Sequence, residues 1–146
     1  MNTFDFKVVT YNGTDHLTWS GMGDLRHYFS DIDGSPERAG FIADSSYNIQ
    51  EKVMIEKGAS FDIHEFTVVD GGKSAIITTE KEEQHDVSSV TSKYPDGYNT
   101  LNKGFREIDL GTGRTNFEWA ALDYGVMVNE SFNLKDVDEG RVWDYL

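Results

Sequence analysis

The sequence has 146 residues, of which 26 are acidic and 13 are basic, so its formal net charge at pH 7 is −13. This charge opposes binding to nucleic acid or to an anionic membrane surface. Hydrophobic residues make up 38% and aromatic residues 13%, which is enough for a folded core, and the absence of cysteine excludes disulfides and thiolate chemistry.

Eight short segments rich in Phe, Val, Ile, Thr and Trp predict β-strands, and helical periodicity is almost absent. In chain order these segments are 4–10, 16–19, 40–44, 49–55, 64–69, 74–79, 104–110 and 114–119. Turn sequences join them in pairs, at Asn12-Gly13, 44–48, Gly71-Gly72 and 109–113. The polar stretches 20–39 and 80–103 are predicted to be long inserted loops. The sequence therefore predicts an all-β fold.

The predicted strands repeat along the chain. Segments 6–9 and 66–69 have related sequences and are 60 positions apart, and Gly40-Phe41 and Gly104-Phe105 open two later strands 64 positions apart. We therefore predict two consecutive four-stranded antiparallel units, at about 1–57 and 61–120, with 121–146 as a connector to a missing next unit. Such units are typical of β-propeller blades, and a single β-sandwich is the alternative.

Two blades cannot form a closed propeller, because a ring needs at least about four. Either the chain is a piece of a larger protein, or copies associate, or the two units pack in another way. We expect self-association or missing blades. The association should become stronger with salt, which screens the charge of −13.

Six strings that cover most of the chain resemble the arylsulfotransferase-like β-propeller family, in particular its fungal-type branch. They are 11–19 (YNGTDHLTW), 44–48 (DSSYN), 64–66 (HEF), 86–90 (DVSSV), 106–109 (REID) and 117–119 (FEW). The resemblance implies a six-bladed propeller in full-length members, of which this chain would be about two adjacent blades. It leaves open an extracellular or secretory location for the parent protein.

The resemblance also implies a chemistry. The bacterial enzymes of the family transfer a sulfuryl group between phenolic compounds through a histidine nucleophile, without a nucleotide sulfate donor, and His, Asn and Arg side chains bind the sulfate. His64, followed by Glu65, resembles the first histidine of the family's His-(His)-Asp/Glu motif. The resemblance therefore implies that His64 is a substrate-binding residue in the central funnel and is not the nucleophile.

Two departures from the family argue against activity of the isolated chain. The family's His-x-Asn-Ser string closely follows a Trp-Asp-Tyr string, whereas here the string 143–145 is followed only by Leu146. Tyr124 stands where the family tends to have a histidine. We therefore expect no catalytic residue, no cofactor and no turnover in this chain.

The other candidate residues have simpler interpretations. His16, His27 and His85 lack the spacing of a zinc site, so we predict a hairpin role for His16 and surface positions for the other two. Segments 31–34 and 136–140 begin like calcium loops but lack the later ligands, which predicts plain turns.

Chance accounts for the remaining patterns. Carboxylates are so frequent that facing pairs for glycoside chemistry arise without selection, for example among Asp62, Glu82, Glu83 and Asp86. Asn12 and Asn129 begin N-glycosylation sequons, which matter only in a secreted parent protein.

The aromatic residues at strand positions are predicted to be core residues; they are Trp19, Phe66, Phe105, Phe117 and Trp119.

Two functions remain open. The first is that of an arylsulfotransferase-like propeller fragment whose parent acts on small phenolic or aryl sulfate molecules. The second is that of a non-catalytic β module for binding or assembly. No apolar run approaches the ~18 residues of a membrane span, so membrane insertion is not expected. The first 15 residues are too polar for a signal peptide, which leaves the compartment of the protein open.

Overall fold

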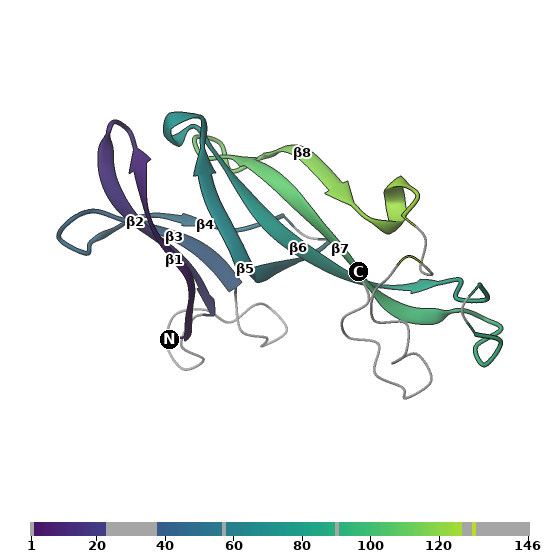
Figure 1. The fold of residues 1–146 in the computed structure, drawn as a ribbon. Coiled ribbons are helices and arrows are strands. Elements are labelled where there is room, and N and C mark those ends of the chain that lie inside the picture. The colour runs from purple at the N-terminus through teal and green to yellow at the C-terminus, as the bar shows by residue number, and fades with distance from the viewer. Residues whose placement is uncertain (1, 23–37, 57, 90, 127–129, 131–146) are drawn as a thin grey trace.

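The computed structural model describes residues 2–22, 38–56, 58–89, 91–126 and 130. Within these residues the chain is all-β, as predicted, with two single-turn 3₁₀ helices at Asp70–Gly72 and Leu122–Tyr124 (Figure 1). The strands are β1 (Asn2–Tyr11), β2 (Thr14–Met22), β3 (Arg38–Ala43), β4 (Ile49–Val53), β5 (Ser60–Val69), β6 (Ser74–His85), β7 (Tyr98–Asp109) and β8 (Thr115–Ala120).

The strands form two four-stranded antiparallel sheets, in the orders β1-β2-β3-β4 and β5-β6-β7-β8. The predicted pair of four-stranded units is therefore confirmed. The predicted turns are present as well. Asn12 and Gly13 have φ angles of 50° and 80°, as a tight two-residue hairpin requires, and Gly71 and Gly72 have φ angles of 65° and 101°.

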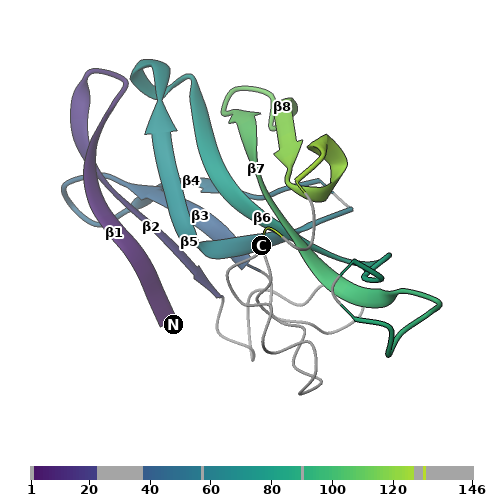
Figure 2. The same ribbon diagram turned by 45° about the vertical axis from the view of Figure 1, so that its right-hand side comes forward.

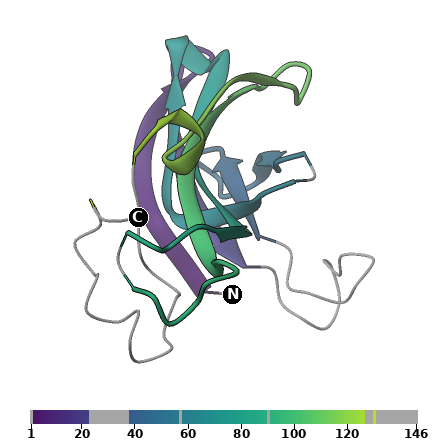
Figure 3. The same ribbon diagram turned by 90° about the vertical axis from the view of Figure 1, so that its right-hand side faces the viewer.

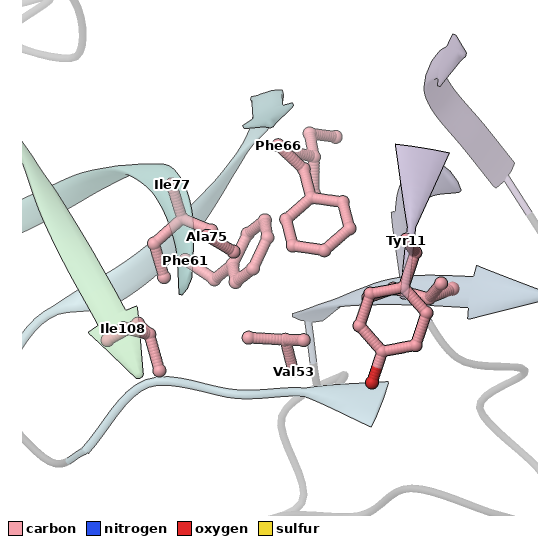
Figure 4. Packing of buried hydrophobic residues seen from close by; sticks show 9 residues of the cluster. Tyr11, Val53, Phe61, Phe66, Ala75, Ile77 and Ile108 are labelled. Carbon is pink, nitrogen blue, oxygen red and sulfur yellow. The ribbon is translucent and has the colours of Figure 1, made fainter. Parts of the chain in front are cut away.

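The two sheets contact each other mainly through β5, which packs against β1, β2 and β3 (Figure 2). Side chains from both sheets form one hydrophobic core. Phe66 of β5 is fully buried there, beside Phe61 and Ile77 (Figure 4). Phe117 is 51% exposed, so its predicted place in the core was wrong. A Cβ atom at Gly40 of β3 would lie 2.5 Å from the ring of Phe66, so only glycine lets the sheets approach this closely.

The prediction of a long loop over 80–103 was wrong. β6 and β7 stay paired from Ser74 opposite Asp109 to His85 opposite Tyr98, so only residues 86–97 connect them. This hairpin projects beyond β5 and β8 in Figure 1 and comes toward the viewer in Figure 3. The strands are polar here because the pairing buries no apolar face. Sequence periodicity detects a strand by its apolar face, so this part of the hairpin was not predicted.

The prediction that Gly40 and Gly104 open their strands was also wrong, because β3 begins at Arg38 and β7 at Tyr98. Gly40 packs on Phe66 and therefore faces the second sheet. Gly104 is paired with Thr79 and Ala120, two residues along β7 from Arg106, whose side chain donates to the carbonyl oxygen of Glu56 in the connection between β4 and β5. The two glycines thus take different places in the two sheets, although each sequence motif lies in the third strand of its unit.

Candidate functional site

His64 lies inside β5, and the predicted strand start at this residue was wrong by four positions. The pairing of β5 with β6 shifts register between Phe61 and Phe66, so the backbone around His64 departs from a regular ladder. Its side chain is 74% exposed, and Nδ1 of the imidazole contacts a carboxylate oxygen of Asp62. This contact sets the orientation of the ring and leaves Nε2 as the nitrogen available to a ligand.

Asp62 is largely buried, with a side chain 12% exposed, so its carboxylate needs polar partners. His64 is one partner. Nζ of Lys103, from β7, lies 3.8 Å from the other carboxylate oxygen of Asp62 and 3.2 Å from Glu80. Glu80 also accepts a hydrogen bond of 2.5 Å from Arg38 of β3, so both sheets contribute to this group. We call these five residues (Arg38, Asp62, His64, Glu80 and Lys103) the His64 cluster.

The formal charge of the His64 cluster depends on the imidazole. Two cations face two carboxylates, so the cluster is neutral when His64 is neutral and carries one positive charge when His64 is protonated. A neutral imidazole would offer a lone pair on Nε2, and an imidazolium would offer an N–H donor. The ring of Phe4 lies 6.3 Å from the imidazole, tilted by 59°, and adds an apolar surface beside it.

A second polar group, next to the His64 cluster, joins the first strands of the two sheets. Nζ of Lys7 lies 2.9 Å from Asp5 and 2.8 Å from the hydroxyl of Thr67, and also contacts Glu65. Asp5 in turn accepts a hydrogen bond of 2.6 Å from the backbone N–H of Phe66. This Lys7 junction fixes β5 against β1 and so positions the backbone that carries His64.

The Lys7 junction shifts the pKa values of its own charged groups. Hydrogen bonds from Lys7 and then Thr67 hold the pKa of Glu65 below its ordinary value. Burial alone would lower the pKa of Lys7, but its hydrogen bonds with Glu65 and Asp5 outweigh this effect and raise the pKa. Each partner therefore favours the charged form of the other.

We expect the Lys7 junction to stabilise the fold only between two pH limits. Because the pKa of Glu65 is lower in the folded state, its stabilisation is present above the unfolded-state pKa and is lost as the pH falls through the folded-state value. Because the pKa of Lys7 is raised, its stabilisation is lost as the pH rises through the folded-state value. Glu65 is 46% exposed, so the loss should stay below ~1 kcal/mol.

Urea unfolding of the wild type and of Glu65→Gln across pH checks this expectation. The wild type should be the more stable at neutral pH, and the two curves should converge in acid. A constant difference at all pH values would contradict it. Asp86→Asn provides a matched control, since Asp86 also has a lowered pKa but its hydrogen bonds are to the neighbouring Ser88, in an exposed turn.

The other candidate residues do not join the His64 cluster. Nδ1 of His16 lies 3.1 Å from the carbonyl oxygen of Thr14, in the β1–β2 hairpin where we expected it. His85 ends β6 opposite Tyr98, so its assignment to a loop was wrong. His27, Asn129 and the segments 31–34 and 136–140 lie outside the described residues, and Asn12 is exposed in its turn.

The four carboxylates considered for glycoside chemistry each have other partners. Glu82 accepts from Asn99, Glu83 pairs with Lys81, Asp62 contacts His64, and Asp86 accepts from the backbone N–H of Ser88. Over the part of the chain that the structure describes, no three His, Asp or Glu side chains are arranged to hold a metal ion. In that same part, no helix is long and apolar enough to cross a membrane.

Most members of the His64 cluster were missed from the sequence. Arg38, Glu80 and Lys103 were assigned to loops, and only the strand register brings them to β5. The position of Asp62 could have been predicted, because residues two apart in a strand point to the same face and Asp62 is two positions before His64.

Searches against protein-family models, curated proteins and solved structures found no match to this chain.

Proposed function

We propose that this chain forms two adjacent blades of an arylsulfotransferase-like propeller and binds a small aryl sulfate at the His64 cluster. In this proposal the Nε2 proton of the imidazolium donates to a sulfate oxygen, and the ring of Phe4 packs against the aryl group. The observation that carries the proposal is the exposed imidazole of His64, oriented by Asp62 through Nδ1. The resemblance of the sequence to this family independently selects the same histidine.

The geometry agrees with a binding role rather than a catalytic one. An enzyme of this class needs a histidine nucleophile together with separate donors for the charge on the sulfuryl oxygens. Among the described residues, the hydrogen bonds and ion pairs of His64 do not include a second histidine. Both permanent cations of the cluster, Arg38 and Lys103, are already paired with carboxylates. The chain is therefore proposed to hold a sulfate ester without transferring its sulfuryl group.

Titration with 4-nitrophenyl sulfate, followed by NMR of the histidine ring signals, tests the proposal. We expect a saturable shift of the His64 ring signals, because Nε2 is the ring nitrogen that the contact with Asp62 leaves available to the sulfate. His64→Gln should weaken binding by about tenfold, the lower range for a lost hydrogen bond to a charged group. His16→Gln and His85→Gln are the controls and should bind as the wild type does.

Equal binding by His64→Gln, or no saturable shift at any pH, would overturn the proposal. Inorganic sulfate and phenol, titrated separately, divide the contributions of the charge and the ring. The same samples should release no 4-nitrophenol when an acceptor phenol is added. Release that disappears in His64→Gln would instead indicate a catalytic chain.

The second candidate is a non-catalytic module for assembly, and one observation favours it. Glu80 pairs with both Arg38 and Lys103, so the cluster holds its cations for the contact between β3, β6 and β7. A structural cluster predicts that Glu80→Gln lowers the free energy of unfolding without any gain in affinity for sulfate. A binding site predicts that the same change, by freeing two cations, strengthens the affinity for aryl sulfate.

A further inference from the structure

The charged side chains around His64 nearly cancel one another. The other four members of the His64 cluster are two cations and two carboxylates, so their formal charge is zero. The adjacent Lys7 junction sets the single cation of Lys7 against the carboxylates of Asp5 and Glu65 and therefore carries one negative charge. Apart from the imidazole, the two groups together have a net charge of one negative unit.

Glu65 brings this negative charge next to the exposed imidazole. It directly follows His64 in β5, where the pairing with β6 shifts register. Its carboxylate stays 46% exposed, although Lys7 and Thr67 both contact it. The imidazole is 74% exposed, so a ligand bound to Nε2 is one residue away from a half-exposed carboxylate.

The esters that suit a single N–H donor differ in their charge. A sulfate monoester and a phosphodiester each carry one negative charge, whereas a phosphomonoester carries about −1.5 to −2 at pH 7. All three present tetrahedrally arranged oxygen acceptors, so the donor on Nε2 fits each of them. The second charge of a phosphomonoester needs a further cation, and the described cations Lys7, Arg38 and Lys103 already have carboxylate partners.

We infer that the His64 cluster selects singly charged oxyanion esters, so that it accepts a phosphodiester as it accepts a sulfate ester and discriminates against dianionic phosphomonoesters. This inference rests on the proposed function, because it concerns the same imidazole. The imidazole supplies one donor and no more than one positive charge, which a single anionic charge balances. A second anionic charge would face Glu65 and the net charge of −13 without compensation, and would lose more hydration on binding.

The phosphodiester that fits this site is a small aryl ester. The net charge of −13 repels a polyanion, which excludes a nucleic-acid backbone as the source of the diester. The ring of Phe4 lies 6.3 Å from the imidazole and offers an aromatic surface to an aryl group on the ester oxygen. An aryl diester should therefore bind more tightly than a dialkyl one.

Three esters with the same aryl group test the inference: 4-nitrophenyl sulfate, methyl 4-nitrophenyl phosphate and 4-nitrophenyl phosphate. Each is titrated separately at about pH 7.5, where the phosphomonoester is mostly a dianion, and binding is followed by NMR of the His64 ring signals. The dissociation constants of the first two should agree within about threefold. The phosphomonoester should bind more weakly than both by about threefold or more, the effect of one additional charge at short range in water.

Glu65→Gln removes the carboxylate next to the imidazole and keeps both His64 and Phe4. It should narrow the difference between the phosphomonoester and the sulfate ester to within about twofold. Asp70→Asn is the matched control, because it removes the same charge from a 67% exposed side chain in the turn that follows β5. The control should keep the full difference.

The outcomes separate this inference from the proposed function. Phosphomonoester binding as tight as that of the sulfate ester, or a diester that fails to bind where the sulfate ester binds, would overturn the inference alone. A difference that persists in Glu65→Gln, or disappears equally in Asp70→Asn, would overturn it as well, because the selection would then not arise beside His64. Binding of the diester without the sulfate ester would overturn the proposed function, and binding of none of the three would overturn both.

Discussion

Replacing Phe66 with alanine should lower the free energy of unfolding by about 3–5 kcal/mol, the usual cost of removing a buried aromatic ring. Phe66 is fully buried and packs against both sheets, touching Gly40 of β3 and the ring of Phe61, whose centroid is 6.4 Å away. The cavity left behind would separate β5 from the first sheet. Urea unfolding monitored by tryptophan fluorescence measures the loss.

Phe6→Ala is the matched control, because Phe6 has the same place in the sequence repeat but is 61% exposed. At concentrations where the chain is monomeric, this change should cost less than ~1 kcal/mol. Gly40→Ala should cost about 1–3 kcal/mol by overpacking the same contact, and combining it with Phe66→Leu should cost less than the sum of the two. Additive effects would mean that Gly40 and Phe66 do not share one packing contact.

Replacing Asp5 with alanine should lower the free energy of unfolding by about 1.5–3 kcal/mol, as expected for hydrogen bonds to a charged group. The carboxylate of Asp5 is only 11% exposed and accepts 2.6 Å and 2.9 Å hydrogen bonds from the N–H of Phe66 and from Lys7. Without it, the N–H of Phe66 would be left without its acceptor in the interface. Chemical unfolding at pH 7 measures the effect.

Two variants separate the lost hydrogen bonds from backbone strain. Asp5 has a φ angle of 50° at a β-bulge, a conformation that alanine tolerates poorly and glycine adopts readily. Asp5→Gly relieves the strain but lacks the acceptor, so it should remain destabilised. Asp5→Asn keeps an oxygen acceptor and tolerates positive φ, so it should lose less stability. Full recovery in Asp5→Gly would show that conformation alone explains the alanine effect.

The elements that have a local physical cause could be predicted from the amino-acid sequence. The eight strands were predicted because their segments are rich in β-branched and aromatic residues, and only their bounds differ from the structure. The turns were predicted because Asn12-Gly13 and Gly71-Gly72 readily adopt positive φ angles. The two-sheet division followed from the repeat of these signals along the chain.

Features that depend on partners far apart in the sequence could not be predicted and became visible only in the folded chain. The β6–β7 hairpin reaches His85 and Tyr98 because its backbone groups pair with each other, and this pairing requires no apolar pattern. The bulge in β5 arises where Asp5 of the other sheet takes the N–H of Phe66, a contact between residues 61 positions apart.

The same reason explains the candidate site. His64 and Asp62 are neighbours in one strand, so their contact follows from local geometry. Lys103 and Arg38 reach them only through the register of β7 with β6 and the packing of β3 against β5. Strand register and sheet packing are set by side chains on several segments at once, so no single stretch of this sequence carries the information that assembles the His64 cluster.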